Sequence, residues 1–287
     1  MKITRAFADV AEGQVHLRRA GAGSEVPLVM IHASPGSSKM LSPLILACAA
    51  QREVIAPDTL GNGDSSPPAG DAPGLAAFAD GHLRALSALG VDRFDLYGTH
   101  TGAGIAAEMA IAAPNRVRRV VLDGMSLYEP EECTDMLRHY APGVPIDLNG
   151  SQFNWVWHFV RDVYLFWPWY KRDAAHVRDV GLPSAEVLHD KAVEVLKAIG
   201  TYHLSYLASI GYDKRGRLPL IPCPALVTCN RSDMLWQYFD LIGALVPGGR
   251  KAANPGYGSP AAAEGTARMI LDFFAEPPED AASPGLS

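Results

Sequence analysis

The stretch Gly98-Thr99-His100-Thr101-Gly102 decides how the rest of the chain is interpreted. Small residues two places before and after a central side chain are typical of a sharp turn from a strand into a helix, where neighbouring backbone is crowded. The flanks agree, because 94–97 is expected as a short strand and 103–113 as an alanine-rich helix that Pro114 ends. A nucleophilic hydroxyl normally stands at the centre of such an elbow, and here it is an imidazole. The alternative is a helix-packing G-x-x-x-G pattern with a buried structural histidine.

Composition narrows the classes of protein. The 287 residues are 48% hydrophobic and 20% charged, which predicts one large domain with an insertion. The net charge of −6 argues against a nucleic-acid or anionic-membrane partner. The sequence shows no phosphate loop, dinucleotide fingerprint or metal-ligand cysteine spacing, so we expect no cofactor and no metal. An N-terminus without an apolar signal core predicts a cytoplasmic protein.

Short apolar segments rich in β-forming residues alternate with helical ones, as in a mostly parallel sheet covered on both faces. This rhythm breaks between 126 and 216, and 276–287 is expected as a solvated tail. The expected strands are 14–19, 27–31, 53–56, 94–97, 117–122 and 225–228, and the expected helices are 38–50, 75–89, 103–113, 235–245 and 261–274.

Four segments, taken in order, resemble the α/β-hydrolase fold superfamily, in its cap-containing branch. They are His32-Ala33-Ser34-Pro35-Gly36, similar to an H-G-x-P-G loop; 56–65, similar to A-P-D-x-x-G-x-G-x-S; the elbow at 98–102; and Asp233 just after a strand. The resemblance covers nearly the whole chain outside the central insertion. It implies a mostly parallel central sheet flanked by helices, with a helical cap inserted after the sixth core strand. The core would be 1–125 and 217–275, and the cap 126–216.

The chain departs from this family at the site of chemistry. The resemblance implies a serine nucleophile, a histidine near the C-terminus as its base and an aspartate that orients the histidine. His100 replaces the serine, and no histidine follows His203. Tyr257 lies closest to the missing base, but a phenol with a pKa near ~10 is a poor base at neutral pH. Asp233 is expected to bond Tyr257 or His100, or to cap its own loop.

His100 itself is expected to rest as a neutral imidazole, because the N-terminus of the following helix disfavours a cation. It could then act as a general base or as a nucleophile. Asp123 is a candidate to orient it, or else a turn residue before Gly124. The resemblance also implies an oxyanion hole built from the backbone N–H groups of Ser34 and Thr101.

The insertion is rich in aromatic residues. Trp155, Trp157 and Trp167 are predicted to bind substrate, and His158 or His203 to supply a base from above the pocket. The alternative is a helical segment that needs these rings for its own core.

Together these features predict an enzyme without a serine nucleophile or a cofactor, acting on a small apolar or aromatic carbonyl compound. Hydrolysis of an ester, thioester or C–C bond is one expected reaction, and lyase, decarboxylase or isomerase chemistry is another. The alternative is a non-catalytic protein that binds small molecules. The expected partner is a small-molecule substrate, and homodimer formation stays open.

Overall fold

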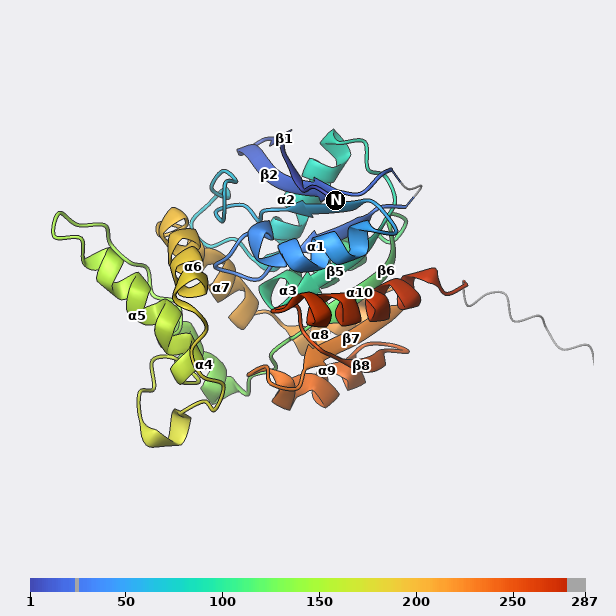
Figure 1. Cartoon of the computed structure of the whole chain (residues 1–287). Helices are drawn as coiled ribbons and strands as arrows, with labels where there is room; N and C mark the ends of the chain where they lie inside the picture. Colours follow the sequence, from blue (N-terminus) through green and yellow to red (C-terminus); the bar gives the residue numbers. More distant parts are fainter. Residues whose placement is uncertain (24–25, 278–287) are drawn as a thin grey trace, which may run out of the picture.

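The computed structural model describes residues 1–23 and 26–277, and one sheet dominates that part of the chain (Figure 1). Eight strands lie in the order β1-β2-β4-β3-β5-β6-β7-β8 among the described residues. The strands are β1 (Thr4–Val10), β2 (Gly13–Ala20), β3 (Leu28–Ile31), β4 (Val54–Pro57), β5 (Phe94–Thr99), β6 (Val117–Asp123), β7 (Ala225–Asn230) and β8 (Arg250–Asn254).

The sheet is parallel from β4 to β8 and antiparallel only where β2 pairs with β1 and β4. Strand β3 shows how a parallel strand is buried on both faces. Val29 and Ile31 pack into one hydrophobic cluster, and Leu28 and Met30 pack into another. Such a strand is therefore a continuous apolar run rather than an alternating one.

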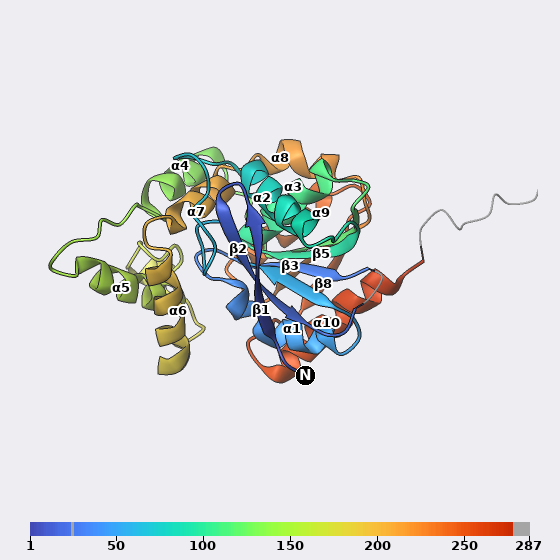
Figure 2. The same cartoon turned by 90° about the horizontal axis from the view of Figure 1, so that it is seen from above.

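Helices cover both faces, as Figure 2 shows from above. Helices α1 (Ser42–Ala49) and α10 (Pro260–Ala275) supply apolar side chains to the cluster that contains Leu28. Helices α2 (Leu75–Ala88), α3 (Thr101–Ala112) and α9 (Phe239–Leu245) supply the cluster that contains Val29. The remaining short elements outside the insertion are α8 (Lys214–Arg217) and the 3-10 turns η1 (Ser38–Leu41), η3 (Leu218–Leu220) and η4 (Trp236–Tyr238).

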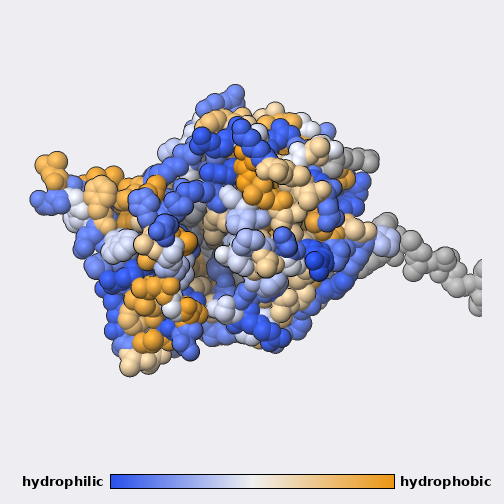
Figure 3. Space-filling model, viewed as in Figure 1, coloured by the Kyte–Doolittle hydropathy of each residue, from blue (hydrophilic) through white to orange (hydrophobic). Residues whose placement is uncertain are grey.

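The insertion lies between β6 and β7, so the position after the sixth strand is confirmed. It contains α4 (Pro130–His139), α5 (Ser151–Leu165), η2 (Ala174–His176), α6 (Ala185–Lys197) and α7 (Tyr202–Ile210). These helices have a hydrophobic cluster of their own, and α5 projects away from the sheet (Figure 1). Orange apolar surface gathers on this projecting part in Figure 3, where exposed side chains include Ile146, Leu148, Phe153 and Trp157.

Two edge strands were not foreseen. Strand β1 is largely exposed and β8 has the polar sequence RKAAN, so neither forms an apolar run. At the start of the expected solvated tail, Arg119 donates to the backbone oxygens of Glu276 and Pro277 at 2.9 and 2.8 Å, and Pro277 is exposed. The rest of that tail, 278–287, lies outside the described residues. No helix in the described part is both long and apolar enough to cross a membrane.

Candidate functional site

The elbow joins the carboxyl end of β5 to the start of α3. His100 has φ 52° and ψ −115°, and it is the one non-glycine residue with positive φ in the described part of the chain. A Cβ atom on Gly98 would lie 2.2 Å from the Gly102 oxygen, and one on Gly102 would lie 2.3 Å from the Ile31 oxygen. Both glycines are therefore needed for close backbone packing, and the turn presents His100 at the end of the sheet.

His100 is hydrogen-bonded to Asp233, which follows β7. The distance from His100 Nε2 to Asp233 Oδ2 is 2.9 Å, and the side chains are 30% and 20% exposed. The Leu235 N–H donates to the other oxygen of Asp233 at 2.8 Å and fixes the carboxylate. Because a neutral imidazole carries one N–H, donation from Nε2 leaves Nδ1 with a free lone pair. Of the two bonds expected for Asp233, the one to His100 forms.

Burial and the carboxylate of Asp233 shift the pKa of His100 in opposite directions. Burial lowers its pKa, but the charge of Asp233 and the hydrogen bond to it outweigh burial, so the pKa of His100 is raised above its ordinary value. Burial raises the pKa of Asp233, yet the imidazole of His100 holds it below its usual range overall. The nearby carboxylate therefore favours the protonated form of this imidazole and opposes the effect of burial.

Asp123 does not orient the imidazole. Its two carboxyl oxygens accept from the Tyr97 hydroxyl at 2.6 Å and from Asn254 Nδ2 at 2.7 Å. Its backbone oxygen accepts from the His100 N–H at 2.8 Å, so it supports the turn instead. Burial raises the pKa of Asp123 to about 6. Asn254, at the end of β8, carries no sequence signal for this bond, because its partner lies on a strand that is distant in the sequence.

Tyr257 lies half-buried against the cluster beside α1 and α10. Burial raises its pKa further above the ordinary value of a phenol, and Thr99 is its hydrogen-bonding neighbour. Tyr257 makes no bond to Asp233 among the described residues, so the other expected partnership of Asp233 is not formed. A phenol in this state does not replace the missing C-terminal base.

The two residues assigned to an oxyanion hole flank the elbow. The Ser34 N–H has no hydrogen-bond acceptor within the described residues, and Thr101 is the first residue of α3, whose N–H lacks an intrahelical acceptor. The Ser34 hydroxyl bonds Ser205 Oγ at 2.7 Å, with no histidine beside it. His32 holds the loop, because it bonds the Ala33 oxygen and accepts from the Thr59 N–H, each at 2.8 Å.

The residues predicted to bind substrate are divided between separate parts of the structure, and their role stays a prediction. Trp155 and His158 line a cavity whose walls come entirely from the insertion. His203 lines a different cavity between α7 and the 71–76 loop. Trp157 is 42% exposed, and Trp167 packs between the core and the insertion. The hydrophobic periodicity of the sequence does not indicate that His158 and His203 line different cavities.

Two cationic side chains of the insertion affect the pKa values of Asp233 and His100. Arg178 contributes to the low pKa of Asp233, and Lys191 opposes the rise in the pKa of His100. Lys191 Nζ also lies 5.0 Å from the centre of the Tyr164 ring. Within residues 1–23 and 26–277, neither cation forms an ion pair with a carboxylate. These two cations of the insertion therefore contribute to the electrostatics of the His100–Asp233 pair.

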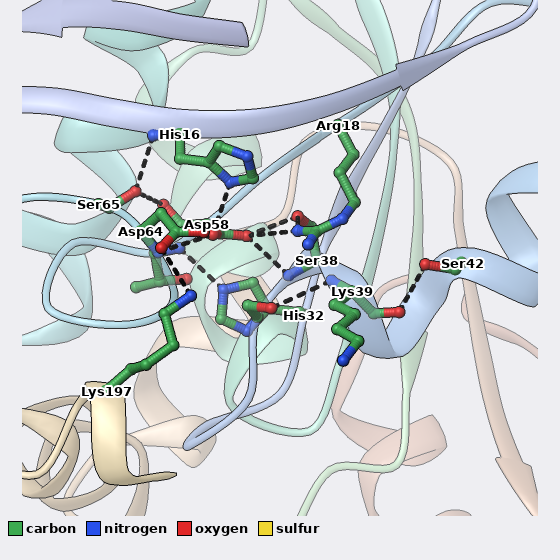
Figure 4. Close-up of polar contacts among 12 residues, drawn as sticks. His16, Arg18, His32, Ser38, Lys39, Ser42, Asp58, Asp64, Ser65 and Lys197 are labelled. Atoms are coloured by element: carbon green, nitrogen blue, oxygen red, sulfur yellow. Dashed lines mark hydrogen bonds and ion pairs between the residues drawn. The ribbon is translucent and has the colours of Figure 1, made fainter. Parts of the chain in front are cut away.

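A separate polar cluster at the sheet edge has the composition of a metal site. Ligand atoms of His16, Asp58 and Asp64 lie within 4.8 Å of one another. Figure 4 shows that Asp58 is already satisfied: it bonds His16 at 2.8 Å and accepts from the Ser38 N–H at 2.8 Å and the Asp64 N–H at 3.1 Å. This network fixes two loops, and its geometry does not require an ion.

Comparison with known proteins supports the fold. Residues 26–150 match a family described as "alpha/beta hydrolase fold". The bromoperoxidase of Bacillus anthracis has a TM-score of 0.74 at 20% identity, covering 95% of this chain and 100% of that one. The enol-lactonase of Burkholderia xenovorans LB400 has a TM-score of 0.70 at 18% identity, covering 94% and 100%. The chain therefore has the α/β-hydrolase fold.

Curated relatives share only part of the chain. The 2-hydroxymuconate semialdehyde hydrolase of Pseudomonas sp. (strain CF600) is 40% identical over 39% of this chain and 40% of its own length. The 2-hydroxy-6-oxo-2,4-heptadienoate hydrolase of Pseudomonas putida (strain F1) is 34% identical over 46% of this chain and 49% of its own length. The chain thus spans less than half the length of these relatives.

Proposed function

We propose that this protein, which has the α/β-hydrolase fold, is a hydrolase that uses His100 rather than a serine on a small carbonyl compound. The observation that carries the proposal is the pairing of His100 Nε2 with Asp233 at 2.9 Å on the elbow. A titratable group is thereby oriented and partly exposed where this fold normally presents its nucleophile.

In the proposed reaction, Nδ1 of His100 takes a proton from water, and the water oxygen adds to the carbonyl carbon. The negative charge that develops on the carbonyl oxygen would be stabilised by the N–H groups of Ser34 and Thr101. Collapse of this adduct breaks the bond to the leaving group, which takes the proton back from the imidazolium. Asp233 would stabilise the imidazolium between the two transfers.

The relatives and the charges of the insertion bear on the substrate. The relatives' names specify a semialdehyde and an oxo-dienoate, both carbonyl compounds. Arg178 and Lys191 bring positive charge toward the site, which suits an anionic group on the same molecule. We propose an oxo acid as the first substrate class to test, ahead of neutral aryl esters. The helical segment 126–216 would act as the cap that encloses it.

The test is turnover of the wild type and of His100→Ala on panels of aryl esters and β-keto acids. Loss of a general base costs about 10²- to 10⁴-fold in rate, and we expect His100→Ala to fall in that range. His176→Ala, at an exposed histidine of the insertion, is the matched control and should keep full activity. Unchanged turnover in His100→Ala would overturn the proposal. Serine-directed fluorophosphonates should leave the protein unlabelled, and stoichiometric labelling at Ser34 would contradict the mechanism.

A binding protein without activity is the second candidate. It is favoured by the absence of any histidine after His203, which removes the usual relay. Tight binding of an oxo acid by the wild type without any turnover would support this alternative.

A further inference from the structure

A cavity of about 560 Å³ lies within the insertion, with no part of its wall supplied by the elbow. Asn154, Trp155 and His158 contribute one wall from neighbouring positions on a single face of α5, and Trp169 and Arg172 contribute the other. A volume of this size is in the range of small-molecule sites. The function proposed for His100 does not use it.

The aromatic part of the cavity is a right-angled corner. The rings of Trp155 and Trp169 lie 5.7 Å apart at an interplanar angle of 88°. The Trp169 indole N–H donates to the Tyr140 oxygen at 2.9 Å, which fixes that ring. Trp155 stacks on Phe159 through one face, with ring centres 5.0 Å apart and an interplanar angle of 19°, and Trp169 is 5% exposed. A flat ligand ring would therefore stack on the other face of Trp155 and meet Trp169 at a right angle.

A cluster of charged side chains reaches the cavity through Arg172, the one member of the cluster that lines its wall. Asp162, whose side chain is fully buried, accepts a hydrogen bond from Arg161 Nε at 2.7 Å on one oxygen. Arg172 Nε lies 2.7 Å from the other oxygen and forms an ion pair with it, without hydrogen-bond geometry. Neither arginine pairs with a second carboxylate in the described part of the chain. One carboxylate thus faces two cations, and the cluster keeps one unit of positive charge.

Two contacts hold the Arg172 side chain in place at the cavity wall. Its guanidinium lies 5.5 Å from the centre of the Trp169 ring, while 48% of the side chain stays exposed. Stacking and the ion pair both restrict its conformations, so an incoming anion would order few further groups. His158 and Asn154 have no hydrogen-bond partner among residues 1–23 and 26–277, and both remain available to a ligand.

We propose that this cavity is a second binding site, separate from His100, for a planar aromatic carboxylate. The ring occupies the corner between Trp155 and Trp169, and the carboxylate accepts from Arg172. The site does not depend on the reaction proposed for His100.

Isothermal titration calorimetry of the full chain with 1-naphthoate tests the proposal, and 1-naphthalenemethanol serves as the neutral probe. We expect 1-naphthoate to bind at least about 10-fold more tightly than the alcohol, and Arg172→Gln to remove about that factor. Arg161→Gln is the matched control, because it breaks an ion pair to the same carboxylate from outside the cavity wall. It should weaken binding by less than about 3-fold.

Two further variants locate the bound probe. Asn154 is exposed on α5, so Asn154→Trp should fold normally, fill the cavity and abolish binding. His100→Ala should leave binding unchanged. Equal binding of the alcohol, equal losses in the two arginine variants, or full binding in Asn154→Trp would each overturn the proposal.

Discussion

The carboxylate of Asp233 determines which nitrogen of His100 is occupied by a hydrogen bond. In the usual triad a histidine uses Nε2 as the base and bonds its aspartate through Nδ1. Here Nε2 faces Asp233, so Nδ1 is the nitrogen with a free lone pair. The same contact raises the pKa of His100 against the effect of burial. A general base with a raised pKa is a stronger acceptor but is deprotonated only at higher pH.

Replacement of Asp233 by asparagine should therefore shift the pH profile. If His100 acts as a base, activity rises with pH through the pKa of His100. Asp233→Asn removes the charge that raises this pKa, so the acid limb of kcat/KM should move to lower pH while its plateau falls. The measurement is kcat/KM between pH 5 and 9 for both proteins. Asp240→Asn, at an exposed residue that pairs with Lys251, should leave the profile in place. An acid limb that stays fixed in Asp233→Asn would contradict the role of His100.

At the scale of elements, the strand-turn-helix unit is set by backbone contacts rather than by side-chain polarity. This is why the elbow could be predicted from five residues: the glycines are a direct consequence of the approach of α3 to β3 and β5. Strands β1 and β8 could not be predicted in the same way, because their exposed polar residues lack any periodic apolar signal. The pairing of Asp123 with Tyr97 and Asn254 also escaped prediction, since it joins three strands that are distant in sequence.

Alanine at the elbow glycines should be costly. Gly98→Ala and Gly102→Ala each place a Cβ within 2.3 Å of a backbone oxygen, and backbone rather than a flexible side chain must move. We expect each to lower the free energy of unfolding by about 2–3 kcal/mol or more, as for overpacked cores. Gly143→Ala, where a Cβ would meet nothing within 4 Å, should change stability little. Chemical denaturation measures all three, and equal stability of Gly98→Ala and Gly143→Ala would contradict the close approach.

At the scale of the whole molecule, both exposed ion pairs and buried hydrogen bonds tie the insertion to the core. Lys197 pairs with Asp64 at 2.6 Å in an exposed setting, whereas Ser205 of α7 is fully buried against Ser34. The alternation of apolar strands and helices stops between 126 and 216, and this interruption predicted the insertion. The sequence could not show that the tryptophans and histidines divide between separate cavities, because that division depends on how α5 and α7 pack.

The buried contact should stabilise the junction more than the ion pair does. Ser205→Ala leaves the Ser34 hydroxyl without its partner and weakens the bonding of Asn62. We expect a loss of about 1–3 kcal/mol in unfolding free energy, against about 0–1 kcal/mol for Lys197→Ala. Thermal or urea unfolding compares the two variants. A larger loss in Lys197→Ala would show that the exposed pair dominates the junction.

The positive φ of His100 lowers the free energy of unfolding relative to a protein with glycine at this position. Only glycine adopts φ 52° without steric cost. Any other residue at the elbow therefore costs about 1 kcal/mol or more of folding free energy. His100→Gly should thus unfold at a higher denaturant concentration than His100→Ala, although both lack the imidazole. Stability alone would favour glycine here, which is consistent with the role proposed for the imidazole of His100.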